Sequence, residues 1–216
     1  CALPISKALT DWGIPIHRGL GKTGVVGIVK NGTSNRAVGL RADIDALPMT
    51  EHNHFAHAST HPGKMHACGH DGHTAMLLAA AQHLAGQGCF DGTLHLIFQP
   101  AEEHPGGAKL MIEQGLFEHF PCDAVFAMHN MPGTPQGHFV LRDGPAMASS
   151  DDVTITLHGV GGHGAMPHRA TDPVVAAASI VMALQTIVSR NVDPQQAAVV
   201  TVGALQAGRA NNVIPE

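Results

Sequence analysis

Residues 93–103 read TLHLIFQPAEE, a run of strand-forming apolar residues that ends at a proline and is followed by two carboxylates. Because proline cannot donate to a hydrogen-bond ladder, the strand predicted over TLHLIF, residues 93–98, ends there. Apolar runs of similar length recur along the first 145 residues. They are GVVGIV (24–29), AVGLR (37–41) and DAVFAM (123–128).

Two segments of helical length lie between these runs. TAMLLAAAQHLA (74–85) and GAKLMIEQ (107–114) are rich in strong helix formers, and a glycine follows each of them. Strands that alternate with helices predict an α/β layer sandwich around a largely parallel sheet.

A change of composition predicts a domain boundary. Residues 131–151 are rich in Gly, Pro and Ser, so we expect a first domain over residues 1–148 and a second over 149–216. The second region reads as half of a small α+β domain. Its predicted elements are a period-2 strand (152–158), a helix opened by Asp-Pro (172–189) and a further strand (197–202).

Composition and charge exclude several classes of protein. The net charge of −5 leaves no basic stripe for nucleic acid. The longest apolar run, residues 174–184, is too short to cross a bilayer. The first residues lack a secretory signal and the four cysteines lack paired spacing, so a cytoplasmic protein is expected. The chain begins without Met and stops in mid-pattern, which indicates a fragment.

Acidic and imidazole side chains follow three of the predicted strands. AVGLR runs into Asp43 and Asp45, TLHLIF into Glu102 and Glu103, and DAVFAM into His129. In an open α/β sheet, ligands bind outside the carboxyl ends of the strands. Since the chain also contains 17 histidines, a metal site is expected at this edge.

The segment MHACGHDGH, residues 65–73, is the densest group of metal-binding residue types. Cys68 and His70 are two apart, so both side chains can point the same way from an extended loop. A thiolate and an imidazole suit zinc or another first-row divalent ion. The following helix can lower the pKa of the thiol. The alternative is an inert buried Cys68 with histidines that cap or line the helix.

Two further features suit hydrolytic chemistry. Of the neighbours Glu102 and Glu103, one can bind metal while the other acts as general base toward a metal-activated water. The alternative is an ordinary acidic loop. His163, within the glycine-rich GVGGHGAMPH (159–168), can donate a hydrogen bond to a developing oxyanion, or it lies at the surface of a hairpin.

Several motifs, taken in order, resemble the M20 metallopeptidase family. They are LRADIDALPMTE, GKMHACGHDGHTAMLLAAA, LIFQPAEE, MHN, GGHGAMPH and NNVIPE. They are similar to the branch that holds hippurate hydrolases and other N-acyl-amino-acid amidohydrolases. The resemblance implies a zinc-peptidase-like three-layer α/β catalytic domain over residues 1–148. It also implies that residues 149–216 are the first part of an inserted α+β lid domain that forms homodimers.

The resemblance also implies roles for single residues. Two divalent metal ions (zinc, manganese, cobalt or nickel) are expected to be bound by Cys68, His70, Glu103 and His129. Asp45 is expected to orient a metal ligand, and Glu102 to be the general acid/base. His163 is expected to complete the active site of the partner subunit, and Asn212 to contact the substrate. The family's last metal ligand, a histidine, lies beyond the end of this chain.

The expected function is metal-dependent hydrolysis of the amide bond of small N-acyl or N-aroyl amino acids such as hippurate, with Glu102 as general acid/base. Two alternatives stay open at this point. One is a non-enzymatic histidine-rich metal-binding protein, and the other is a catalytically silent fragment that lacks the C-terminal metal ligand. Neither nucleic acid nor a membrane is expected as a partner.

Overall fold

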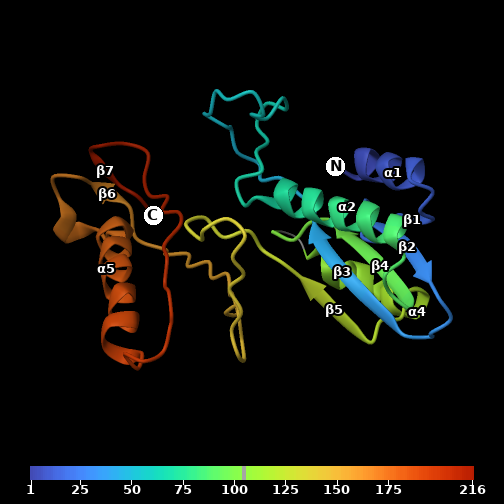
Figure 1. Ribbon diagram of the computed structural model, residues 1–216. Helices are drawn as coiled ribbons and strands as arrows, with labels where there is room; N and C mark the ends of the chain where they lie inside the picture. The colour runs from blue at the N-terminus through green and yellow to red at the C-terminus, as the bar shows by residue number, and fades with distance from the viewer. Residues whose placement is uncertain (104–105) are drawn as a thin grey trace. The chain divides into compact units, whose positions relative to one another are not determined.

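The computed structural model describes residues 1–103 and 106–216 and divides into two compact units (Figure 1). The first unit is Cys1–Phe139 and the second is Val140–Glu216. The division falls inside the Gly-, Pro- and Ser-rich segment 131–151. The assignment of residues 1–148 to a catalytic domain and of residues 149–216 to a lid stays a prediction.

The first unit is built on a five-stranded sheet with the order β1-β2-β4-β3-β5. The strands are β1 (Ile16–Arg18), β2 (Val25–Asn31), β3 (Ala37–Asp43), β4 (Gly92–Gln99) and β5 (Ala124–Ala127). Strand β3 runs parallel to β4 and β5. The expected α/β class is therefore confirmed, with parallel pairing on the side of the sheet that carries the predicted metal ligands.

The other side of the sheet is antiparallel, so the expectation of a largely parallel sheet was wrong there. Strand β2 runs against both β1 and β4. The connections on either side of β2, residues 19–24 and 32–36, are only a few residues long. A parallel crossover takes a dozen or more residues, so these short loops force β2 to reverse direction.

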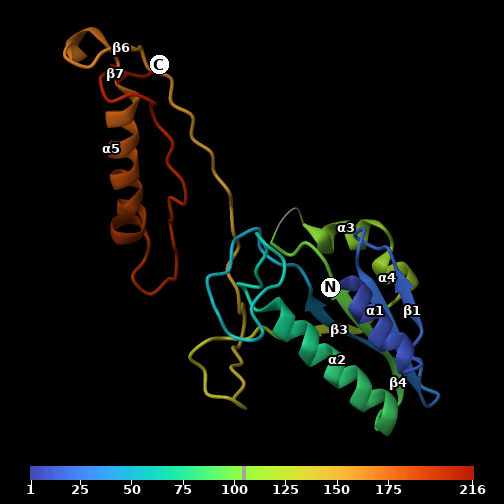
Figure 2. The same cartoon turned by 90° about the horizontal axis from the view of Figure 1, so that it is seen from above.

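Helices cover both faces of this sheet and complete three layers (Figure 2). On one face, α1 (Ala2–Asp11) and α2 (His70–Gln87) pack against Leu96 and Phe98 of β4. On the other, α3 (Gly107–Glu113) and α4 (Leu116–His119) pack against Ile97. Successive side chains of β4 thus point into two apolar cores, one on each face of the sheet, as expected of a strand buried on both faces.

Helices α1 and α2 differ from the sequence-based expectation. Helix α1 was not predicted, although Ile5 and Leu9 have helical i, i+4 spacing and are both buried. Helix α2 begins at His70, four residues before the predicted start at residue 74. Gly69 precedes it in the left-handed conformation (φ 82°), which glycine adopts without steric cost. The helix therefore begins inside the histidine motif.

The second unit contains α5 (Pro173–Thr186) and a π-helical turn, Ile187–Asn191. It also contains a short antiparallel pair, β6 (Gly162–His163) and β7 (Val213–Ile214), and the 3₁₀ turn Pro167–Arg169. The carboxylate of Asp172 accepts a hydrogen bond from the Val174 N–H (2.8 Å). This N-cap explains why the helix begins at the predicted Asp-Pro pair.

The strands predicted over residues 152–158 and 197–202 are wrong: neither segment is a strand in the structure. Val153 is 79% exposed and Val199 is 85% exposed. Within the part of the chain that the structure describes, no strand pairs with either segment. An unpaired strand leaves its backbone hydrogen bonds unmade, so the period-2 pattern alone does not produce one.

Helix α5 and its continuation, Pro173–Asn191, are long and apolar enough to cross a membrane by length and composition. Their mean hydropathy is 1.5, and only 6% of that stretch is buried. Core helices of soluble proteins have the same composition. The expectation of no membrane partner therefore stays a prediction.

Burial of an imidazole in the second core makes stability depend on pH. His95 on β4 is 6% exposed, and its ring lies 5.6 Å from that of Phe120. Burial lowers the pKa of His95. Below about pH 6.5 the unfolded chain takes up a proton at this residue while the folded chain does not, so stability falls as the pH falls.

We therefore expect His95→Leu to weaken the loss of stability between about pH 7.5 and pH 5.5. Urea unfolding of the chelator-treated protein at both pH values measures this loss. His83→Leu, at an exposed position on α2, is the matched control and keeps the wild-type dependence. An unchanged pH dependence in His95→Leu would contradict the assignment.

Candidate metal centre

The carboxyl ends of the three parallel strands bring distant parts of the sequence to one edge of the sheet. Strand β3 ends at Asp43, two residues before Asp45. Strand β4 ends at Gln99, just before Glu102 and Glu103. Strand β5 leads into His129, and α2 begins at the same edge with His70. The predicted ligands of the first unit therefore converge.

His70 lies at the centre of this cluster and is 1% exposed. Its Nδ1 donates to the carbonyl oxygen of Asp45 (3.1 Å) and to the carboxylate Oδ1 of the same residue (3.2 Å). This hydrogen bonding assigns the proton to Nδ1 and leaves a lone pair on Nε2. Nε2 is buried and has no hydrogen-bond partner within residues 1–103 and 106–216.

Carboxylate oxygens surround that unpaired nitrogen. Nε2 of His70 lies 3.7 Å from Oδ2 of Asp43, and 4.0 Å from both Oε2 of Glu102 and Oε1 of Glu103. A buried lone pair that faces several negative oxygens is unfavourable unless a positive charge lies between them. These residues therefore fit a divalent cation.

Cys68 and His129 supply donor atoms beside His70. Sγ of Cys68 lies 3.5 Å from Nε2 of His129. One ligand atom from each of these three residues lies within 4.8 Å of the others. The Nδ1 of His129 donates to the carbonyl oxygen of Asn130 (2.7 Å), so its Nε2 carries the lone pair that faces Cys68. A sulfur and two imidazole nitrogens at this spacing suit zinc and similar ions.

The expected lowering of the Cys68 pKa by the helix is wrong. Burial raises the pKa of the Cys68 thiol, and a hydrogen bond with Glu103 and the negative charges of Glu103, Glu102 and Asp43 raise it further. These effects outweigh the N-terminus of α2. A bound cation would offset the same negative charges and favour the thiolate.

Asp45 joins two parts of the cluster. Its Oδ1 accepts from His70, and its Oδ2 accepts from the backbone N–H of Glu103 (3.2 Å). These contacts fix the orientation of one predicted ligand and the backbone of another, as residues behind a metal site do.

A buried network behind the cluster was missed by the sequence analysis. Asp43, 1% exposed, accepts from Nδ1 of His73 (2.6 Å) and pairs with Nη1 of Arg41 (2.9 Å). Burial raises the pKa of Asp43, but the hydrogen bond from His73 and the charge of Arg41 outweigh it, so the pKa lies below its usual value. The i, i+3 spacing of His70 and His73 was the available signal, since it puts both on one helix face.

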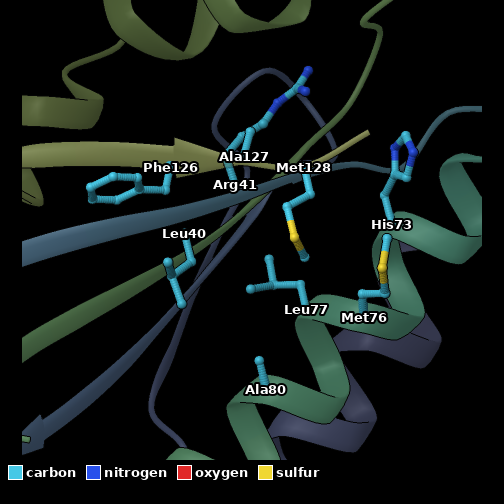
Figure 3. A pocket seen from close by; sticks show the side chains of 9 residues that line it. All are labelled: Leu40, Arg41, His73, Met76, Leu77, Ala80, Phe126, Ala127 and Met128. Carbon is cyan, nitrogen blue, oxygen red and sulfur yellow. The ribbon is translucent and has the colours of Figure 1, made fainter. Parts of the chain in front are cut away.

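A pocket of about 190 Å³ lies on the other side of His73, between α2 and strands β3 and β5 (Figure 3). Arg41 and His73 are its polar residues, and side chains such as Leu77, Phe126 and Met128 supply its apolar lining.

His163 and Asn212 lie together in the second unit. His163 of β6 pairs with Val213 of β7, and the N–H of Gly164 donates to the carbonyl oxygen of Asn212 (2.8 Å). Nδ1 of His163 accepts from the N–H of Ala165 (3.1 Å), which assigns the ring proton to the exposed Nε2. The structure describes these two residues within their own unit, and their roles stay predictions.

Comparison with known proteins places this geometry in context. Residues 39–210 match the model of peptidase family M20/M25/M40. The chain is 53% identical over 212 residues to a hippurate hydrolase of Campylobacter jejuni. That match covers 98% of this chain and 55% of the hippurate hydrolase. The chain is also 46% identical over 213 residues to an N-acetyl-L-cysteine deacetylase of Bacillus subtilis, covering 98% and 51%.

A solved structure shares the fold. The YXEP protein of Bacillus subtilis, described as a dinuclear metal binding peptidase of the M20 family, superposes with a TM-score of 0.70. It is 35% identical in sequence, and the match covers 100% of this chain and 55% of that one. The chain spans about half the length of the relatives it matches. With its family model matched from residue 39 to residue 210, the chain belongs to peptidase family M20/M25/M40.

Proposed function

We propose that this chain is part of a metal-dependent amidohydrolase that cleaves the amide bond of N-acyl or N-aroyl amino acids, with hippurate as a representative substrate. The unpaired, buried Nε2 of His70, which faces carboxylates beside Cys68 and His129, is the observation that carries this proposal. Both curated relatives described above are named for substrates of this chemical class, which supports it.

Two divalent ions occupy this centre in the proposal, with Cys68, His70, Glu103 and His129 as ligands. The mixture of sulfur, nitrogen and oxygen donors suits zinc, manganese, cobalt or nickel. Such ions polarise an amide carbonyl and make a water acidic enough to lose a proton near neutral pH.

Glu102 is the general acid/base in this proposal. Its side chain is 42% exposed against 32% for Glu103. The backbone of Glu103 is held by Asp45, and its side chain bonds to Cys68. Glu102 is therefore the freer of the two neighbouring carboxylates. It accepts the proton of the attacking water and delivers it to the leaving amine.

His163 donates a hydrogen bond from Nε2 to the developing oxyanion, and Asn212 contacts the substrate. The exposed Nε2–H of His163 supports this role. In a cytoplasmic homodimer formed through the second unit, His163 acts in the partner's site. The uncovered apolar residues of α5 support such an association.

Glu102→Gln in the full-length protein is expected to lower kcat for hippurate by about 10²–10⁴-fold, because the proton transfer is lost. The metal content is expected to stay unchanged, since Glu102 is not a ligand. Glycine release measures the rate, and elemental analysis measures the metal. Glu118→Gln, an exposed position on α4, serves as control. Full turnover in Glu102→Gln would overturn this role.

Cys68→Ser is expected to remove the sulfur-to-metal charge-transfer absorption of the cobalt-substituted protein and to weaken metal binding, because the thiolate is lost as a ligand. Absorption spectra during a Co²⁺ titration measure both effects. Cys122→Ser, at the partly buried cysteine before β5, keeps the wild-type spectrum. The same absorption in Cys68→Ser would exclude Cys68 from the ligand set.

A further inference from the structure

We propose that His73 is a positioning residue, which selects the metal-binding nitrogen of His129 by holding the backbone of Asn130. This inference rests on the proposed metal centre for its consequence. The geometry that carries it lies within the first unit and needs neither metal nor substrate.

The two ring nitrogens of His73 have different partners, and these fix its proton. Nε2 lies 2.9 Å from both the backbone nitrogen and the side-chain Oδ1 of Asn130. The backbone N–H can only donate, so Nε2 carries a lone pair, and the Asn130 amide, whose two ends have the same shape, presents its NH₂ group to it. Nδ1 therefore carries the proton, which it donates to Oδ1 of Asp43 (2.6 Å). A neutral imidazole satisfies the Asp43 carboxylate and the Asn130 backbone N–H together only in this tautomer.

The buried carboxylate that orients His73 is itself held in place. Nη1 of Arg41 lies 2.9 Å from Oδ2 of Asp43, and Nε of Arg41 donates to Oε1 of Gln99 (2.8 Å). Arg41 and Gln99 belong to the neighbouring parallel strands β3 and β4. The orientation of His73 is thus set by residues of the paired strands β3 and β4.

Asn130 passes this orientation to His129. Its carbonyl oxygen accepts from Nδ1 of His129 (2.7 Å), which leaves Nε2 of His129 to face Cys68. The ring of His73 also meets that of His129 edge-on, with centroids 4.5 Å apart. His73 therefore contacts both the peptide and the ring that it positions.

The segment after β5 requires this support. Strand β5 pairs with β3 only as far as Ala127, so the sheet does not hold His129 and Asn130. The Asn130 side chain lies against the start of α2, where a Cβ at Gly69 would overlap its amide. His73 is 2% exposed, and it also lines the pocket between α2 and strands β3 and β5 (Figure 3).

The same contacts exclude His73 as a metal ligand. Asp43, His70 and His73 offer ligand atoms within 4.8 Å of one another. Both nitrogens of His73 are already used, one as donor and one as acceptor. No lone pair remains for a cation, so His73 acts through Asn130.

The test uses two substitutions of His73, each of which keeps only one of the two hydrogen bonds of the ring. In His73→Asn the side-chain amide reaches the position of Nδ1 and keeps the contact with Asp43, but it loses the acceptor for the Asn130 N–H. In His73→Gln the amide reaches the position of Nε2 and keeps that acceptor. His83→Asn, exposed on the same helix, is the control.

Long-range ¹H–¹⁵N correlation spectra of the metal-free chain report which nitrogen of each histidine carries the proton. In the wild type and in His83→Asn, we expect both His73 and His129 to carry the proton on Nδ1. In His73→Asn we expect His129 to be a mixture of both tautomers. In His73→Gln we expect His129 to be in the Nδ1–H form, as in the wild type. Co²⁺ affinity is expected to fall about 10–100-fold in His73→Asn and to recover in His73→Gln.

A single Nδ1–H form of His129 and unchanged Co²⁺ affinity in His73→Asn would overturn the proposal. So would an Nε2–H form of His73 in the wild-type spectrum, which keeps the test decisive if a variant fails to fold. The spectra are recorded without substrate, so absence of hydrolase activity would contradict the proposed function and leave this inference intact.

Discussion

One buried nitrogen atom, Nε2 of His70, determines what the first unit can do. Asp45 occupies the other nitrogen of the ring, so this lone pair points into a space bordered by carboxylates and a thiol. Without a cation the arrangement is costly, because a desolvated acceptor faces other acceptors and the thiol keeps its proton. A divalent ion would be attractive to all of these acceptors and would favour loss of the thiol proton. Such an ion would also account for the positions of Cys68, His129 and both glutamates around this nitrogen.

The architecture explains how the chain can maintain such a cluster. Parallel pairing of β3 with β4 and β5 aligns three strand ends, and two apolar cores stabilise the sheet from both sides. A left-handed Gly69 then starts α2 within the histidine motif, so His70 and His73 enter the cluster from one helical turn. Of the predicted ligands, His70 lies on a helix, while Cys68, Glu103 and His129 lie in short segments that directly precede or follow these elements. The elements therefore fix where each of these segments starts or ends.

Much of this arrangement could be predicted from the sequence, because strand ends in an α/β sheet meet at one edge. The pattern predicted β2 to β5 and brought Cys68, His70, Glu103 and His129 together, with the family resemblance assigning their roles. It did not predict the Asp43–His73–Asn130 network. The i, i+3 spacing of His70 and His73 puts both on one helix face, but it does not identify the hydrogen-bond partners of a buried imidazole. The strands expected near residues 152–158 and 197–202 failed for a different reason. Alternation describes a face, and strand formation also needs a paired neighbour, which the described residues do not supply.

Anomalous X-ray diffraction from zinc-loaded crystals of the full-length protein tests the central claim most directly. We predict a zinc peak within about 2.0–2.3 Å of both Nε2 of His70 and Sγ of Cys68. Zinc bound only elsewhere, for example by the exposed histidines of residues 52–61, would contradict the account.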